Sequence, residues 1–461
     1  MDTYRSRIFT EEELNKIRGQ FYYVDEDHYG RKRLFFDNAG GSLRLKKAEE
    51  VFHLIDSMPD ASEHSNSIAR ELAALEDRGR EDIKKVIFGA KSGTIYPSYT
   101  ASQIAMEMVR VITENARGTN IVTTMLEHPS VFDAARLYSR IHGMELRVAG
   151  VNKETGGVDA DTILSLIDQN TALLCCMAAS NISGYIYETE KICRRAREIN
   201  PDIYIYIDAV QHAPHGVLAP EEWGADVTSF APYKFFGVRG FGLAYLSDRV
   251  SRFVHHRLLG KPEDDWEIGS PATAQFAVIT EIINYVAGLG GAVCHEGGTA
   301  SSEGGTASSG CEAAFLLGKT APPEGGTACP EEQSRRKLFE IGMQRIADHE
   351  RGLLDMMLEG VDGIPGLRHI PGVTVQMDGK DLTTRDLILG IEFENLSCEQ
   401  AVVEYEKRGV ITFERALSSM YSKRMVEAFD SKGMVRLSPL HVNTPQEIRH
   451  FLVLTQEMAG L

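Results

Sequence analysis

Short apolar runs alternate with amphipathic segments through the first two thirds of the chain. Mainly apolar runs predict strands at 120–124, 145–150, 171–180, 203–210, 226–231 and 241–247. Between them, the segments 130–143 and 188–200 carry apolar residues at helical spacing. A repeated order of strand, helix and strand is typical of an α/β fold with a large, mostly parallel sheet.

This pattern stops between 292 and 334, where Gly, Ser and Thr dominate. The unit EGGTA recurs from Glu296, Glu303 and Glu324 and has no apolar face to bury. Such a composition cannot offset the entropy cost of ordering, so it predicts a low-complexity, flexible insertion.

The apolar periodicity resumes after the insertion with a long amphipathic helix starting near 335. Strands are then predicted at 387–394, 409–413 and 434–440. These elements predict a smaller C-terminal α/β domain. The sequence therefore divides into an N-terminal arm (1–34), a large domain (35–291), the insertion (292–334) and a small domain (335–461).

Composition narrows the classes of function. The 461 residues carry a net charge of -17, which argues against a nucleic-acid partner. No apolar run reaches the length of a membrane span, and the charged start of the chain predicts a cytoplasmic protein. The seven cysteines form no CxxC pair and no ladder at zinc spacing, so we expect reduced thiols and no metal site.

Polar side chains follow several of the predicted strands at their carboxyl ends. Asp208 and Gln211 follow one strand, His128 a second and Asn181 a third. In open α/β sheets this edge is where ligands bind. Taken singly, these signals are weak: a helix cap explains Asp208, and a structural turn explains His128, more readily than a ligand site does.

Lys234 stands in the segment SFAPYKFFGVRGFG, between a Pro-Tyr pair and a glycine-rich run. Together with FFDNAGGS, SYTASQIA, EHPS, NISG, DAVQ, EIGSPA and VRLSPLHVNTPQEI, in this order, it resembles the class V aminotransferase family of pyridoxal-phosphate enzymes. That family includes cysteine desulfurases, selenocysteine lyases and isopenicillin-N epimerases. The resemblance implies a fold-type-I enzyme with pyridoxal 5'-phosphate as cofactor.

The resemblance also implies a role for each polar residue of the large domain. Lys234 matches the lysine that binds the cofactor aldehyde covalently and moves protons at the substrate Cα. Asp208 matches the carboxylate that pairs with the pyridine nitrogen. His128 matches the residue stacked on the ring and is, with Lys234, a catalytic candidate. Gln211 and Asn181 match the groups near the ring hydroxyl.

Further positions match the phosphate and substrate contacts of the family. Thr100 and the backbone at Tyr99 match the phosphate cradle, and Tyr233 adjoins the lysine. Ser270 resembles a phosphate contact supplied by the partner subunit, which implies a homodimer with shared active sites. Arg436 matches the arginine that pairs with the substrate α-carboxylate.

Two departures from desulfurases concern the reaction itself. The segment 414–425 lacks the catalytic cysteine that desulfurases carry there, and Ala231, Pro232 and Tyr233 replace their usual Ser-Gly-His. Arg415 and His64 are weaker substrate candidates, since a solvated surface role fits both equally well.

The resemblance favours a C–S or β-elimination lyase acting on a small amino acid. The alternative is an aminotransferase or epimerase of the same family, which would use the same lysine, aspartate and arginine. A remote alternative is a non-catalytic binding protein that has kept the fold.

Overall fold

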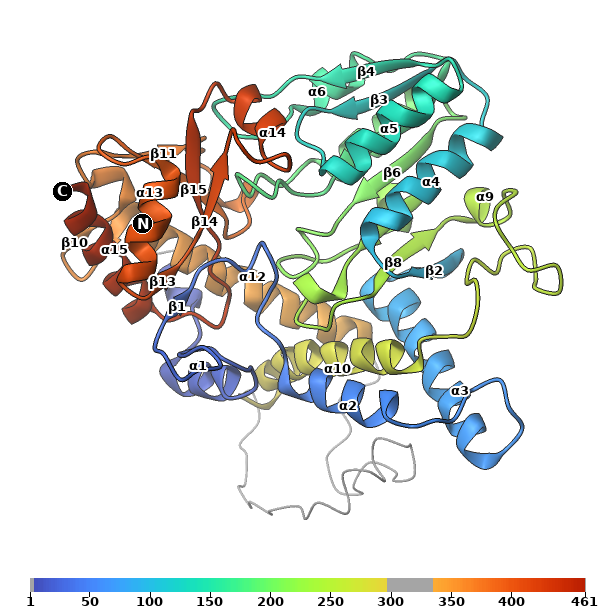
Figure 1. The fold of residues 1–461 in the computed structure, drawn as a ribbon, viewed down its shortest axis with the longest axis horizontal. Coiled ribbons are helices and arrows are strands. Elements are labelled where there is room, and N and C mark those ends of the chain that lie inside the picture. Colours follow the sequence, from blue (N-terminus) through green and yellow to red (C-terminus); the bar gives the residue numbers. More distant parts are fainter. Residues whose placement is uncertain (1–3, 297–334, 461) are drawn as a thin grey trace.

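The computed structural model describes residues 4–296 and 335–460, and only the backbone of 292–296. A seven-stranded sheet has the order β2-β8-β7-β6-β5-β3-β4, with helices on both faces (Figure 1). Its strands are β2 (Thr94–Ser98), β3 (Asn120–Thr124), β4 (Glu145–Ala149), β5 (Thr171–Met177), β6 (Tyr204–Asp208), β7 (Val227–Phe230) and β8 (Gly242–Leu246). Only β8 runs antiparallel to its neighbours β7 and β2. The predicted α/β class and mostly parallel sheet are confirmed.

Both faces of the central strands are buried, which explains why they read as continuous apolar runs. Leu173 and Cys175 of β5 pack in the cluster that also holds Ile104 and Met108 of helix α4 (Ala101–Asn115). The alternate residue Cys176 packs in the main core on the opposite face. This division follows from the two-residue repeat of a strand.

The helices of the described chain are α1 (Glu11–Arg18), α2 (Lys46–Asp56), α3 (Ser67–Glu81), α4 (Ala101–Asn115), α5 (Pro129–Ile141), α6 (Ala160–Leu164), α7 (Thr189–Ile199), α8 (Pro220–Trp223), α9 (Asp248–Ser251), α10 (Thr273–Glu296), α12 (Arg335–Glu359), α13 (Cys398–Lys407), α14 (Lys423–Ala428) and α15 (Pro445–Ala459). Among these described residues, no helix is both long and apolar enough to cross a bilayer.

A second sheet forms the core of the C-terminal part. Its order is β11-β12-β15-β14, and every neighbouring pair is antiparallel. The strands are β11 (Val373–Gln376), β12 (Leu389–Phe393), β14 (Phe413–Ala416) and β15 (Gly433–Leu437). Short strand pairs complete this part: β9 (Gly360–Val361) pairs with β10 (Ile364–Pro365).

Residues near the predicted start of the large domain contact the C-terminal part instead. Strand β1 (Leu34–Phe35) pairs in parallel with β13 (Val410–Ile411), and Phe36 is buried in the C-terminal core. Helix α10 continues to Glu296, whereas the sequence places the insertion from 292. The rest of that insertion, with its EGGTA units, lies outside the described residues, and the division into domains stays a prediction.

Helices α10 and α12 lie side by side beneath the large sheet and connect the two parts (Figure 1). A Cβ on Gly342 of α12 would lie 1.9 Å from the Val286 carbonyl oxygen, and one on Gly290 of α10 would lie 2.0 Å from that of Leu338. The two glycines therefore allow the helix backbones to approach closely.

Candidate active site

The carboxyl edge of the large sheet borders a cavity of about 350 Å³. Eight of the twelve residues predicted for the site line it: Tyr99, Thr100, His128, Asn181, Asp208, Gln211, Tyr233 and Lys234. They lie at or after the carboxyl ends of β2, β3, β5, β6 and β7. The parallel strands bring these residues together because their carboxyl ends meet at one edge.

Asp208 is the last residue of β6, and its side chain is buried at the cavity. Burial raises the pKa of this carboxyl, while the Val210 amide, which donates to Oδ1 at 3.0 Å, and the Lys234 amine lower it. A buried carboxylate of this kind needs a cationic partner to stay charged. A protonated ring nitrogen facing it would supply one.

Lys234 ends a short 3-10 turn, Pro232–Lys234, immediately after β7. Only 9% of the residue is exposed. Burial, and then the Arg436 cation, lower the pKa of Lys234 to about 7, although Asp208 opposes this shift. The amine is therefore available in its neutral, nucleophilic form near pH 7.

His128 caps the N-terminus of α5 with its ring. The ring Nδ1 accepts from the Ser130 amide at 3.2 Å and lies 2.7 Å from the Ser130 hydroxyl. Burial, and then the Lys234 charge, lower the pKa of His128 to about 4. The imidazole is thus neutral and fixed in orientation, as a ring stacked on a flat cofactor requires.

The phosphate cradle is predicted at the N-terminus of α4. Thr100 is the cap residue, and its hydroxyl accepts from the Gln103 amide at 3.1 Å. A Cβ on Gly242 would lie 2.4 Å from the Ala101 nitrogen, so only glycine lets β8 pass this close to the helix start. Helix N-termini favour bound anions because their first amides lack intrahelical partners.

Two buried amide oxygens in the cavity wall remain without a hydrogen-bond partner in the described chain: Asn181 Oδ1 and Gln211 Oε1. Buried polar atoms are rarely left unpaired, so these two point to a missing ligand. Together with the buried amine, the buried carboxyl and the phosphate cradle, they fit pyridoxal phosphate.

Two arginines from the small sheet approach the same site. Arg436 of β15 lies directly opposite Phe413 of β14, and Arg415 lies two residues further along β14. Both guanidinium carbons lie within 6 Å of the Phe413 ring centroid, at 5.1 Å for Arg436 and 5.8 Å for Arg415. Both cations also lower the pKa of Lys234. Arg436 Nη1 also donates to the carbonyl oxygen of Asn181 in the cavity wall, so the two arginines lie beside the cavity, although neither lines it.

Three site residues were not anticipated from the sequence. Asp37 contacts Arg436 Nη2 through Oδ1 at 2.6 Å. Glu127 is fully buried beside His128, and burial raises its pKa to about 8. Arg424 donates to the backbone carbonyl oxygens of Met125 and Glu127 and so holds α14 against the His128 turn. Glu127 could have been predicted as a site residue from the sequence, because it directly precedes the candidate His128.

The remaining two candidates lie outside the cavity. Ser270 lines an adjoining groove, which shares Tyr99, Gly240 and Phe241 with the cavity. His64 is exposed in the loop between α2 and α3 and is absent from the cavity lining. In the structure of one chain, neither reaches Lys234.

No described cysteine lines the cavity either. Cys398 begins α13, in a separate surface pocket, and burial raises its pKa to about 12. A thiol in this state is a poor nucleophile.

Comparison with known proteins supports the class that the site defines. The profile of the aminotransferase class-V family matches residues 34–297, more than half of the chain. A cysteine desulfurase IscS from Dictyoglomus turgidum is 27% identical over 228 residues, covering 49% of this chain and 53% of the relative. The match therefore spans about half the length of that relative. A probable cysteine desulfurase from Streptomyces coelicolor is 26% identical, covering 59% of this chain and 71% of the relative.

Solved structures share the fold across nearly the whole chain. The apo cysteine desulfurase from Thermococcus onnurineus NA1 superposes with a TM-score of 0.74 at 17% identity, covering 98% of this chain and 99% of that one. The Escherichia coli cysteine desulfurase CsdA gives a TM-score of 0.72 at 14% identity, covering 98% of both chains.

The fold and the site thus define a fold-type-I, pyridoxal-phosphate-dependent enzyme. Within that class, the chain belongs to the aminotransferase class-V family.

Proposed function

We propose that the chain is a pyridoxal-phosphate-dependent C–S lyase of cysteine desulfurase-like type, acting on a small amino acid. The observation that carries this proposal is that Lys234 and Asp208 line one cavity, while two arginines with unpaired N–H groups lie beside it. The relatives named as cysteine desulfurases support the choice of a sulfur substrate.

In this mechanism the large domain holds the cofactor. Lys234 binds its aldehyde, Asp208 holds the ring nitrogen and neutral His128 packs on the ring face. The amides at the start of α4 hold the phosphate, and the oxygens of Asn181 and Gln211 accept from groups on the cofactor and substrate.

The small sheet holds the substrate carboxylate. Nε and Nη2 of Arg415 and Nε of Arg436 are buried without hydrogen-bond partners among the described residues. One carboxylate has enough lone pairs to accept from all three N–H groups. This contact fixes which substrate bond faces the cofactor plane.

When bound, pyridoxal phosphate supplies an electron sink for the pair left behind as the Cα–H bond breaks. The neutral Lys234 amine takes that proton. Loss of the sulfur group from Cβ completes the elimination. With one water, cysteine would then give pyruvate, ammonia and hydrogen sulfide.

A second candidate is an aminotransferase or epimerase of the same family. The observation that favours it is the sequence of the β14–α14 connection, 417–422, which has no cysteine. Either reaction would use the same Lys234, Asp208 and arginines, and would differ only in the steps after the Cα proton has been removed. A purely non-catalytic role fits less well, because it gives no reason to bury Lys234 beside Asp208.

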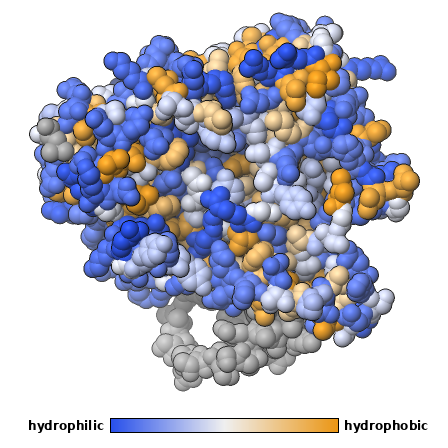
Figure 2. Space-filling model, viewed as in Figure 1, coloured by the Kyte–Doolittle hydropathy of each residue, from blue (hydrophilic) through white to orange (hydrophobic). Residues whose placement is uncertain are grey.

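We further propose a homodimer in which the partner chain closes the groove that contains Ser270. The loop after α9 displays large apolar side chains at its surface: Leu259 is fully exposed and Val254 is 80% exposed. Figure 2 shows apolar side chains at the edge of the molecule where Figure 1 places this loop. Exposed apolar surface of this kind is typical of protein interfaces.

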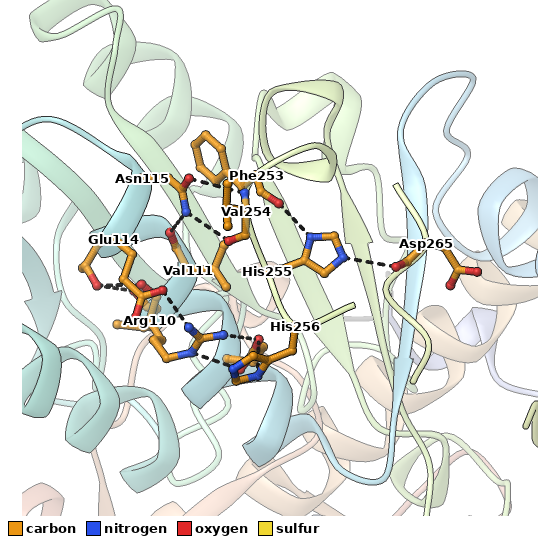
Figure 3. A network of polar contacts seen from close by, with 12 residues as sticks. Arg110, Val111, Glu114, Asn115, Phe253, Val254, His255, His256 and Asp265 are labelled. Carbon is orange, nitrogen blue, oxygen red and sulfur yellow. Dashed lines mark hydrogen bonds and ion pairs between the residues drawn. The ribbon is translucent and has the colours of Figure 1, made fainter. Parts of the chain in front are cut away.

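This loop is nevertheless held in a defined shape (Figure 3). The Asn115 side chain of α4 donates to the carbonyl oxygens of Val111 and Val254. His255 contacts the carbonyl oxygens of Phe253 at 2.7 Å and Asp265 at 3.1 Å, and its ring stacks on Trp266 at 3.8 Å. A preformed apolar loop loses little entropy when a second copy binds it.

Replacing the lysine tests the proposed function. Lys234→Ala should lose both turnover and the cofactor fraction that borohydride fixes to the protein, whereas Lys91→Ala, at an exposed position, should keep both. Normal turnover by Lys234→Ala would refute the proposal.

A further inference from the structure

We propose that Asp37 sets the number of acidic groups the substrate can carry, so that the site prefers amino acids with an uncharged side chain. The inference rests on the proposed function, because it concerns the carboxylate-binding end of the same cavity. It starts from the charges that the small sheet and the β1 turn bring together.

Arg436 is already occupied in the structure. Its Nη2 donates to Asp37 Oδ1 at 2.6 Å, and its Nη1 donates to the Asn181 carbonyl oxygen at 3.2 Å. The side chain of Arg436 is only 3% exposed and that of Asp37 21%. A charge-assisted contact with so little solvent access is strong, and Asp37 therefore neutralises one of the two arginines.

Arg415 is a buried cation without an ionic partner in the described part of the chain. The residue is 5% exposed, and no hydrogen bond or ion pair to its guanidinium occurs within the described residues. The neighbouring Glu414 precedes it in β14, so its side chain points to the opposite face of the sheet. Arg415 lies two residues from Phe413 on β14 and so on the same face of the sheet as Arg436. Arg436 in turn donates to the carbonyl oxygen of Asn181 in the cavity wall.

Of the other charges near the cavity, Arg239 lines the wall at an exposed position, where water and ions screen its charge. Lys234 and Asp208 face the cofactor, and Arg424 is bound to backbone carbonyl oxygens. The substrate end is left with two guanidinium cations and one carboxylate. Its net charge of about +1 matches one substrate carboxylate. A second acidic group would enter without a further buried cation to pair with among the described residues.

Removing the charge of Asp37 should therefore allow a substrate with a second acidic group to bind. Asp37→Asn keeps an oxygen for Arg436 but leaves two unneutralised guanidinium groups. L-Aspartate and L-asparagine are matched probes, because they have nearly the same shape and differ by one charge. Their dissociation constants can be read from the change in the visible cofactor band of the full-length holoenzyme, without any turnover.

We expect the wild-type enzyme to bind L-asparagine more tightly than L-aspartate. In Asp37→Asn the ratio of the dissociation constants of L-aspartate and L-asparagine should fall by roughly tenfold or more, in favour of L-aspartate. The control Glu414→Gln removes a nearby charge on the other face of the strand and should change this ratio of dissociation constants by less than roughly threefold.

An unchanged preference in Asp37→Asn, with both ligands still binding, overturns the inference and leaves the proposed function intact. If Asp37→Asn fails to fold or to hold the cofactor, the test uses the wild-type enzyme. Binding of L-aspartate that is as tight as that of L-asparagine, or tighter, overturns the inference. If no amino acid, including L-cysteine, alters the wild-type band, the proposed function fails, and the inference fails with it.

Discussion

At the residue scale, burial controls the chemistry of the site. Lys234, His128 and Glu127 all have pKa values displaced toward the neutral form, and desolvation is the largest cause in each case. Groups that titrate far from their usual range cluster at functional sites. The directions of these displacements lead to two predictions.

The first prediction concerns the rate at which the apo protein attaches pyridoxal phosphate. Attachment needs the neutral Lys234 amine, whose pKa is lowered from 10.5 to about 7. The rate should rise with pH and level off just above 7, falling about tenfold per pH unit well below that value. Stopped-flow absorbance measures it directly. A rate that keeps rising toward pH 10 would show that the amine is not buried as described.

The second prediction concerns Glu127, whose pKa is raised from 4.5 to about 8. Between these values the folded chain keeps a proton that the unfolded chain has lost, so this residue makes folding less favourable as pH rises from about 5 to 8. Glu127→Gln removes that loss. Its free energy of unfolding, relative to wild type, should therefore increase from pH 5 to pH 8 in urea titrations. Glu394→Gln, at an exposed position, serves as control. If the free energy of unfolding of Glu127→Gln differs from that of wild type by the same amount at pH 5 and pH 8, the raised pKa of Glu127 is contradicted.

At the element scale, the sequence predicted most of the large sheet and part of the site. Strands such as β5 and β6 were found because burial on both faces makes them continuously apolar. Strand β1 was missed, since two residues carry no periodic signal. The contact between Asp37 and Arg436 was missed for another reason: the two residues are 399 positions apart, and only the pairing of β1 with β13 and of Asp37 with Ser438 brings them together.

The third prediction tests how closely α10 packs against α12. In Gly342→Ala the new Cβ would overlap the Val286 carbonyl oxygen and push α12 away from α10. This change should lower the free energy of unfolding by roughly 1–3 kcal/mol. Gly288→Ala is the matched control in α10: nothing lies within 4 Å of the added Cβ, and alanine should stabilise the helix by roughly 0.5–1 kcal/mol. Equal effects in denaturant titrations would mean that the helices are not closely packed.

At the scale of the whole molecule, we expect two chains for each active unit. The fourth prediction is that Leu259→Asp, which places a charge on the fully exposed loop residue, shifts the holoenzyme toward monomer in sedimentation experiments. Val403→Asp, at a 48% exposed position on α13, should leave the dimer intact. A wild-type enzyme that is monomeric and fully loaded with cofactor would rule out a shared site.

The central claim is that the enzyme eliminates sulfur and does not transfer an amino group. The most direct test adds L-cysteine to the holoenzyme with no amino acceptor present, while the visible cofactor band and the keto acid are measured together. A lyase gives many equivalents of keto acid per site, and the band returns when the substrate is exhausted. If instead one equivalent forms and the band stays lost until a keto acid is supplied, the protein is an aminotransferase and the central claim is wrong.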